Sequence, residues 1–454
     1  MWDRPYLSRL YQLSLPIMLQ NLFVVLGSIA TVLMVGQLGD VPMAAIGLAN
    51  QLYYILSLVQ FGISSGSAIF TAQFWGDQDT DSIQKVLGVS LLLGLAASTV
   101  FAVIALLFPT PFLHIFTTDE AVIRMGTVLL RIVGISYFFT PVINSYSFIL
   151  RSTGNARLPM LVSTSGVLLN ILLGYTLVFG KLGFPAMGAQ GAAFANLIAR
   201  VTESILLVWM VYKIKTPLAV HPRHLFSFSP PFTKMILGRV LPVMTNEFLW
   251  SLGISAYNAV FARISTESIA AIGIKESVDN LIFVPFLGIT HATSVLVGNA
   301  IGSGDPKRSQ GFIRQSIVII WVLAILLGAG IGISRHAIAS LYQVSAVTQS
   351  YAANLLLVLG FFLWVRTCNT LFFLAMMRGG GDNRFAYRMD VGSMWLVGVP
   401  AAVLAAFVFK LPVYYVYLAV MLEECLKLGV CIWRYRSRRW IHDLVSVKKA
   451  MDTP

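Results

Sequence analysis

The feature that most constrains the fold of this chain is a series of long apolar segments spread over almost its whole length. A bilayer-spanning helix needs about 20 mostly apolar residues, and twelve segments meet that requirement. They cover residues 11–36, 44–73, 87–109, 122–150, 159–180, 187–212, 237–262, 269–300, 315–334, 350–377, 389–409 and 413–433. Only 11% of the residues are charged, against roughly 25% in soluble globular domains. The sequence therefore excludes a soluble enzyme and predicts an all-α integral membrane protein with twelve transmembrane helices.

The 454-residue chain has a formal net charge of +13, which in a soluble protein would indicate binding to nucleic acid. Here the positive charges lie mainly in short loops between the apolar segments. Of the 32 Lys and Arg residues, 22 fall on the side that holds both termini and 5 on the opposite side. Cytoplasmic loops carry such an excess, so we expect cytoplasmic termini and no nucleic-acid partner. The expected location is the plasma membrane of a bacterium or archaeon.

The two halves of the chain are repeats of each other. Sliding the sequence by 226 residues places Pro16 on Pro242 and Asp79 on Asp305 without a gap. Since each repeat has six predicted spans, both begin on the same side of the membrane and the repeats are parallel. Transporter sites usually lie at repeat interfaces near the midplane, so we expect two six-helix repeats around a central cleft. The predicted domains are an N-terminal bundle (1–212), a cytoplasmic linker (213–236), a C-terminal bundle (237–434) and a cytoplasmic tail (435–454).

Two glycine-rich motifs are similar to enzyme signatures, but both lie inside apolar segments. Residues 62–66 match the G-x-S-x-G pattern, which needs a strand–turn–helix context. Residues 328–332 are likewise embedded in a predicted helix. No Walker motif occurs, and the three cysteines show no metal-ligand spacing. We therefore expect helix packing at both motifs, no enzyme activity and no bound cofactor.

Glu247 is the most informative ionisable residue, because it lies about ten residues into the seventh span. A charge in the membrane interior costs about 2.5 kcal/mol or more and indicates function by default. A kink at Pro242 would free backbone carbonyls beside it. Burial favours the neutral form of a carboxyl group, so Glu247 is expected to carry a proton near neutral pH or, when ionised, to bind a cation. The alternative is a structural hydrogen-bonding role. Its repeat mate is the neutral Asn21.

A second group of charges lies in the eighth span. Glu276 and Asp279 are three residues apart and share a helix face, whereas Lys275 is expected to point elsewhere. Two carboxylates on one face are compatible with a cation site. An ion pair with Arg366 of the tenth span is an equally open alternative.

Several other charges in the spans are interpreted as structural. Asp390 is placed at the interface, near the cytoplasmic start of its span. Arg131, and Arg200 with Glu203, are expected to form internal ion pairs at helix ends.

The last span carries three charges. Glu423 and Lys427 are four residues apart, so we expect them to neutralise each other. This leaves Glu424 without an obvious local partner.

Short motifs spread over nearly the whole chain point to one known group. They are Leu15-Pro16 and Met34-Val35-Gly36-Gln37-Leu38-Gly39 in the first span, Asn170 in the fifth, Gly180-Lys181-Leu182-Gly183-Phe184-Pro185 after it, Leu241-Pro242 with Asn246-Glu247 in the seventh, Val297-Gly298-Asn299 in the eighth, Arg378-Gly379-Gly380-Gly381-Asp382 after the tenth, and Glu423-Glu424 before Arg438-Arg439-Trp440. Together these motifs resemble the multidrug and toxic compound extrusion (MATE) family, within the wider group of flippase-like exporters.

The resemblance implies twelve helices in two bundles and export of amphipathic organic cations, driven by a Na⁺ or H⁺ gradient. The seventh-span carboxylate that the family uses for cation coupling falls on Glu247. The family's first-span acid is replaced by Thr31, the acid that often follows Asn170 falls on Gly174, and no acid lies near Thr367. Coupling is therefore expected in the second half.

We accordingly expect three cation-coupling carboxylates, Glu247, Glu276 and Asp279, with Glu247 also the ligand of a metal cation. The residues expected to line the substrate cleft are Asn21, Thr31, Asn170, Asn246, Arg366 and Asn369. The predicted function is secondary active multidrug efflux, in which a monomer in the lipid bilayer exports organic cations in exchange for Na⁺ or H⁺ by alternating access.

Two other functions are weighed against this one. A lipid-linked oligosaccharide flippase should have a strongly cationic cleft to hold pyrophosphate, and the carboxylates at Glu247, Glu276 and Asp279 disfavour it. A binding or receptor protein without transport is disfavoured because no soluble domain is predicted beyond the short tail.

Overall fold

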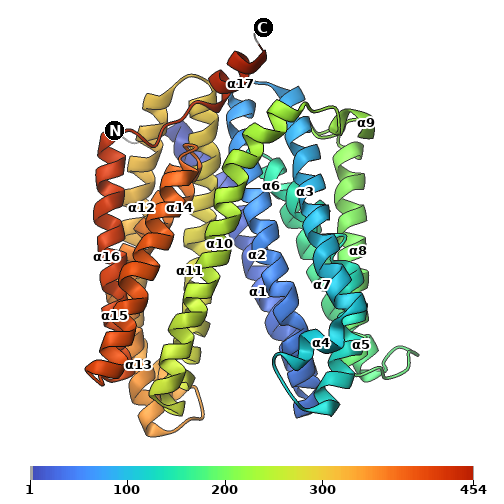
Figure 1. The fold of residues 1–454 in the computed structure, drawn as a ribbon, viewed down its shortest axis with the longest axis vertical. Coiled ribbons are helices and arrows are strands. Elements are labelled where there is room, and N and C mark those ends of the chain that lie inside the picture. Colours follow the sequence, from blue (N-terminus) through green and yellow to red (C-terminus); the bar gives the residue numbers. More distant parts are fainter. Residues whose placement is uncertain (1–3, 453–454) are drawn as a thin grey trace. The chain divides into compact units, whose positions relative to one another are not determined.

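The computed structural model describes residues 4–452, and every regular element in this range is a helix (Figure 1). The elements are α1 (Arg4–Gly36), α2 (Asp40–Gly76), α3 (Thr80–Leu107), α4 (Pro109–His114), α5 (Glu120–Ser136), α6 (Thr140–Ser152), α7 (Arg157–Phe179), α8 (Ala189–Lys213), α9 (Pro222–Leu225), α10 (Pro230–Ile264), α11 (Thr266–Gly302), α12 (Pro306–Ser340), α13 (Ala346–Thr370), α14 (Asn383–Ser393), α15 (Val399–Val403), α16 (Val413–Ser437) and α17 (Leu444–Asp452), with the π-helical segments η1 (Leu371–Arg378), η2 (Met394–Gly398) and η3 (Leu404–Val408).

The helices account for all twelve predicted spans. Within the described residues, nine helices are long and apolar enough to cross a membrane, and the α5–α6 pair, bent by 44°, makes a tenth span. Two further helices have sufficient length, α10 with 35 residues and α16 with 25, but they carry internal charges. Each predicted apolar segment coincides with one of these spans, and several helices extend beyond it. The predicted all-α membrane architecture is confirmed.

The internal repeat is visible in how the third span of each half begins. The Asp79 carboxylate accepts a hydrogen bond from the backbone N–H of Ser82 at 3.0 Å and caps α3. Its repeat mate Asp305 accepts one from the backbone N–H of Arg308 at 3.0 Å and caps α12. A carboxylate at this position satisfies N–H groups that the helix leaves unpaired. The aspartate that occurs in both repeats therefore has a structural role, as a helix cap.

The packing divides the chain into two compact units. Among the described residues, unit 1 comprises 4–18 and 245–452, and unit 2 comprises 19–244. Both boundaries fall inside a helix, in α1 and in α10, and they lie at positions 226 residues apart (244 minus 18). The first turns of α1 therefore pack with the second repeat, and the first turns of α10 pack with the first repeat.

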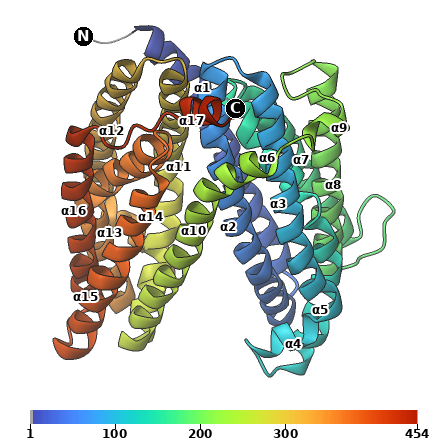
Figure 2. The same ribbon diagram turned by 45° about the horizontal axis from the view of Figure 1, so that its top comes forward.

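Each unit has its own apolar core. In unit 1 the core joins α10, α11, α13 and α16 through side chains such as Ile272, Leu355 and Val416. In unit 2 it joins α2, α3, α5 and α8, with Leu52 and Leu130 among the buried side chains. The start of α1 and the C-terminal α17 lie at the same end of unit 1 (Figures 1 and 2), as an even number of spans requires.

The two glycine-rich motifs serve helix packing, as predicted. In unit 2 a Cβ on Gly62 would lie 2.7 Å from Met244 Cα, and one on Gly66 would lie 3.1 Å from Val240 Cα, so α2 and α10 pack closely there. In unit 1 a Cβ on Gly328 would collide with the carbonyl oxygen of Gly360 where α12 meets α13. Small residues allow helix backbones to approach in this way.

We predict that Gly328→Leu destabilises unit 1, because the added side chain forces α12 and α13 apart. Overpacking of this kind costs about 1–3 kcal/mol, which should appear as a lower Tm of the purified protein in detergent. Gly330→Leu on the same helix is the matched control, since a Cβ there meets nothing within 4 Å. Equal Tm values for the two variants would contradict the packing role of Gly328.

Candidate functional site

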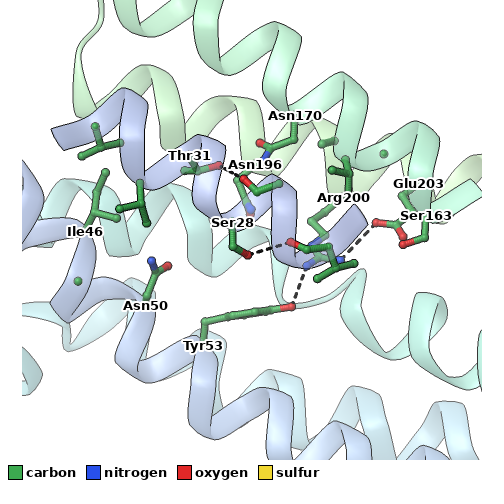
Figure 3. A pocket seen from close by; sticks show the side chains of 18 of the residues that line it. Ser28, Thr31, Ile46, Asn50, Tyr53, Ser163, Asn170, Asn196, Arg200 and Glu203 are labelled. Atoms are coloured by element: carbon green, nitrogen blue, oxygen red, sulfur yellow. Dashed lines mark hydrogen bonds and ion pairs between the residues drawn. The ribbon is translucent and has the colours of Figure 1, made fainter. Parts of the chain in front are cut away.

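Unit 2 contains a cavity of about 340 Å³ between α1, α2, α7 and α8 (Figure 3). This volume lies at the lower end of the range for small-molecule sites, about 300–1,000 Å³. One wall is apolar and includes Val24, Val35 and Ile46. The polar lining consists of Ser28, Thr31, Asn50, Tyr53, Ser163, Asn170, Asn196, Arg200 and Glu203. Amide and hydroxyl groups therefore outnumber charges in this cavity.

The two charges that line the cavity are paired. Arg200 Nη1 lies 3.3 Å from Glu203 Oε2, and Arg200 Nη2 donates a hydrogen bond to the Tyr53 hydroxyl at 3.0 Å. The guanidinium also lies 5.7 Å from the centroid of the Tyr53 ring. The predicted Arg200–Glu203 ion pair is confirmed, although it lies near the middle of α8 and not at a helix end. The prediction for Arg131 is wrong, because its side chain is exposed and makes no ion pair with any described residue.

Two of the predicted cleft residues, Thr31 and Asn170, line this cavity. The Thr31 hydroxyl donates to the carbonyl oxygen of Gly27 at 3.0 Å. At Gly174, a Cβ would lie 3.1 Å from Met34 Cε. Neither position thus supplies a carboxylate, and Glu203 is the one acid among the cavity-lining residues. Asn21 lies on α1 of unit 2 but is not among the residues that line the cavity.

The sequence reasoning missed Asn50, Tyr53 and Asn196. A signal was present, because Asn50 and Tyr53 are the repeat mates of Glu276 and Asp279. Positions that carry charges in one half can line a cavity in the other. A position-by-position comparison of the two repeats would have identified Asn50 and Tyr53.

In unit 1, Glu247 forms an ion pair with Arg378 of η1, and both side chains are largely buried. A similar contact occurs in unit 2. There Arg151, which aligns with Arg378 when the offset is one residue longer, donates from Nη2 to Oε1 of Gln20, the residue before Asn21, at 2.6 Å. The two halves therefore share an arginine at this position but differ in its partner. The partner is a carboxylate in unit 1 and a neutral amide in unit 2.

Asp279 lies between two cations. Its Oδ1 is 2.8 Å from Arg366 Nη1, and its Oδ2 is 3.6 Å from Lys275 Nζ. The ion-pair alternative for Asp279 is confirmed. The expectation that Lys275 points elsewhere is wrong, because residues four apart in α11 share a face. Glu276 is half-buried and forms no ion pair within residues 4–452.

Lys427 of α16 is the centre of a larger group of charges. Its Nζ contacts Glu423, as predicted, and lies 2.9 Å from Asp390 Oδ1 and 3.7 Å from Glu424 Oε1. The placement of Asp390 at the membrane interface stays a prediction, but its side chain is buried within unit 1. Its exposed fraction is 9%, because Lys427 and the amide of Asn246, at 3.1 Å, replace water around it.

Glu424 has a partner from another helix. Asn369 Nδ2 of α13 donates to Glu424 Oε2 at 2.7 Å and to its backbone carbonyl at 2.8 Å. Three predicted cleft residues, Asn246, Arg366 and Asn369, thus belong to unit 1, where each donates to a carboxylate. Among the described residues, no group of three or more His, Cys, Asp and Glu side chains is arranged to hold a metal ion. Metal binding at Glu247 stays a prediction.

The backbone near this group departs from the α-helical pattern. The segments η1, η2 and η3 are π-helical, and such segments are frequent at functional sites. A Cβ on Gly398, the last residue of η2, would collide with the Tyr257 hydroxyl and with Glu423. The missing side chain leaves room for the hydrogen bond from Tyr257 to Glu423 at 2.5 Å.

The sequence matches the MatE family model over residues 16–176 and 242–404. The two matched segments begin 226 residues apart (242 minus 16), which is the offset of the internal repeat. Together they cover well over half of the chain.

Curated relatives are similar over most of their length. A probable multidrug resistance protein YoeA of Bacillus subtilis is 26% identical over 401 residues, or 88% of this chain and 86% of the relative. A multidrug resistance protein NorM of Burkholderia vietnamiensis is 26% identical over 417 residues, or 87% and 86%.

Solved structures share the fold. A crystal structure of MATE in the bent conformation superposes with a TM-score of 0.87 at 22% identity, covering 99% of this chain and 97% of that one. A MOP superfamily transporter from Pyrococcus furiosus, described as having a binding pocket of reverse polarity that suggests a different function, gives 0.86 at 22% identity and 95% coverage of both chains.

The family model fits both repeats, the curated relatives align along most of their length, and the helical fold is that of MATE structures; the chain belongs to the MatE family of multidrug efflux transporters.

Proposed function

We propose that this protein exports amphipathic organic cations across the plasma membrane in exchange for Na⁺ or H⁺ by alternating access. The observation that carries the proposal is the division of chemistry between the units. Unit 2 has a small-molecule cavity whose lining charges cancel, and unit 1 holds most of the buried carboxylates. Substrate is bound mainly in unit 2 and the driving cation in unit 1. Both termini face the cytoplasm.

The cavity of unit 2 supports a small amphipathic substrate. Its valine and isoleucine wall offers apolar contact, while three asparagine amides offer hydrogen bonds in either sense. A cationic group can share the Glu203 carboxylate with Arg200, and the Tyr53 ring attracts cations by cation–π interaction. An organic cation thus satisfies Glu203 without leaving a buried charge unpaired.

The coupling step is assigned to Glu247. Its carboxylate is neutralised by Arg378 in this structure, and an incoming Na⁺ or H⁺ would neutralise it instead. A cation that binds one state better than the other shifts the equilibrium by the difference in affinity. Glu276, which forms no ion pair with a described residue, is an accessory carboxylate. Asp279 can contribute only after Arg366 or Lys275 releases it.

The flippase alternative receives less support. A pyrophosphate group needs several uncompensated cations, and Arg200 of the cavity is neutralised by Glu203. The relatives of known description are multidrug resistance proteins.

We predict that Glu247→Gln uncouples transport. Accumulation of an ethidium-type dye in energised inverted vesicles, whose cytoplasmic face is outside, should fall by roughly 5- to 150-fold, the range of a coupling free energy of about 1–3 kcal/mol. Separate Na⁺ and pH gradients identify the coupling ion. Asp81→Asn removes an exposed carboxylate that pairs with Lys85 and is the control. Full gradient-driven efflux in Glu247→Gln would refute the assignment.

We also predict that Glu203→Gln weakens binding of cationic dyes, because Arg200 then stands in the cavity without its counter-charge. The loss should be on the order of tenfold or more in Kd, since each 1.4 kcal/mol changes an affinity by that factor. Fluorescence titration of the purified protein measures it. The double variant Arg200→Gln/Glu203→Gln, which is again neutral, should recover much of the affinity. Unchanged Kd values in all variants would place the substrate elsewhere.

A further inference from the structure

The buried ion pairs of α11, α13, α14 and α16 do not balance. The first group is Asp279 with Lys275 and Arg366, and the second is Lys427 with its three carboxylates. Lys275 also lies 5.0 Å from the ring centroid of Tyr417 on α16, the helix that carries Lys427. Together they contain four carboxylates and three cations. With every group ionised, the network is one positive charge short.

The missing charge is not shared evenly among the carboxylates. Asp279 has two cationic partners. Glu423 contacts Lys427 and accepts hydrogen bonds from the Tyr257 hydroxyl at 2.5 Å and from Ser393 Oγ at 3.4 Å.

The other two carboxylates can be ranked by the same criterion. Asp390 has Lys427 Nζ at 2.9 Å and Asn246 Nδ2 at 3.1 Å. Of the three carboxylates that contact Lys427, Glu424 is the farthest from Nζ, at 3.7 Å, and it has only Asn369 as a close donor. The deficit of positive charge is therefore greatest at Glu424.

Asn369 supplies a second, independent observation. Its Nδ2 donates to Glu424, but its carbonyl oxygen Oδ1 is buried and has no hydrogen-bond partner among the described residues. The residue is only 4% exposed. A buried acceptor without a donor is unfavourable, because it has lost its hydrogen bonds to water. Ionised Glu424 cannot satisfy it, because a carboxylate only accepts.

A proton on Glu424 resolves both observations. The protonated carboxyl group gains one O–H donor. The acceptor that lacks a donor is Asn369 Oδ1, and Asn369 already donates a hydrogen bond to Glu424. Acid and amide then form a pair of opposed hydrogen bonds, in which Nδ2–H donates to the acid and the acid O–H donates to Oδ1. The same proton brings the network to neutrality.

We propose that Glu424 is an exchangeable proton-binding site of this transporter, with Asn369 as its positioning residue. Its side chain is 21% exposed, against 2% for Glu423 and 12% for Asp390, so it is the most accessible of the three carboxylates for exchange. Proton binding by Glu424 does not depend on the proposed function. Its consequence, that Glu424 sets the pH dependence of transport, does rest on that function.

The titratable and charged groups around this site come from five helices. They are Tyr257 on α10, Lys275 and Asp279 on α11, Arg366 and Cys368 on α13, Asp390 on α14, and Tyr417, Glu423, Cys425, Lys427 and Cys431 on α16. The neighbouring η2, α15 and η3 carry no titratable side chain. Lowering the pH loads the proton on Glu424 and raising it returns the network to one net negative charge.

The test is infrared difference spectroscopy of the purified full-length protein, recorded between low and high pH without Na⁺, substrate or gradient. We expect the C=O stretching band of one protonated carboxyl group that disappears as the pH rises. Glu424→Gln should abolish this band, while Asp305→Asn, which removes an exposed carboxylate of the same unit, should leave it unchanged. Survival of the band in Glu424→Gln would overturn the proposal.

A second variant keeps the test decisive if Glu424→Gln does not fold. Asn369→Leu removes the acceptor, so the band should persist but shift to the higher frequency of a less hydrogen-bonded acid. An unshifted band in Asn369→Leu would also refute the pairing. Absence of any protonated carboxyl band in the wild type, together with a Na⁺-induced spectral change lost in Glu424→Gln, would show that Na⁺ neutralises the network instead.

The consequence for transport is tested separately. Dye efflux by Glu424→Gln should lose its dependence on pH while Glu247→Gln loses its dependence on the gradient. A failure of dye efflux in the wild type would contradict the proposed function but leave the infrared result intact. A wild-type pH profile in Glu424→Gln would overturn the role of Glu424 in transport.

Discussion

The interior of unit 1 depends on one lysine. Lys427 contacts three carboxylates from two helices, and without it these acids would have no cation at close range. Removing one partner of a buried ion pair typically costs about 3–5 kcal/mol, more than most single contacts contribute. The helices α14 and α16 can therefore carry charge inside the membrane only as a joined set. The amide groups of Asn246 and Asn369 extend that set to α10 and α13.

The two units show what changes when a common scaffold is duplicated. Three features are retained in both halves: the aspartate that caps the third span, the unit boundary inside the first span, and the arginine at positions 151 and 378. The ionisable groups are not. Unit 2 has amides and a tyrosine where unit 1 has carboxylates, as at Asn21, Asn50 and Tyr53. The scaffold is symmetric because it is set by apolar packing, whereas the chemistry is asymmetric because few polar substitutions suffice to change it.

Most of the fold could be predicted from the sequence, because apolar length and the positive charge of the loops are local signals. The charged groups were predicted best where the partners lie on one helix, as for Glu423 with Lys427 and Arg200 with Glu203. Exceptions are Lys275 with Asp279 on α11, which was missed, and Asp279 with Arg366 of α13, which was one of two alternatives. Asp390 and Glu424 were left without partners, because Asn246, Lys427 and Asn369 come from helices distant in sequence. Helical spacing gives no information on contacts between helices. Thr31 and Asn170 of the cavity in unit 2 were therefore predicted, but the α2 and α8 side chains that complete it were missed.

The first turns of α1 belong to unit 1 and the first turns of α10 belong to unit 2. This arrangement has a consequence for biosynthesis. Unit 1 is discontinuous, since its first segment ends at residue 18 and the remainder begins at residue 245. Domains made in order on the ribosome generally fold from the N-terminus, but here the earliest segment waits for the second half to emerge. Unit 2, which ends at residue 244, is complete only when α10 has begun. A cut in the linker between α8 and α10 would therefore leave each fragment without part of its own unit.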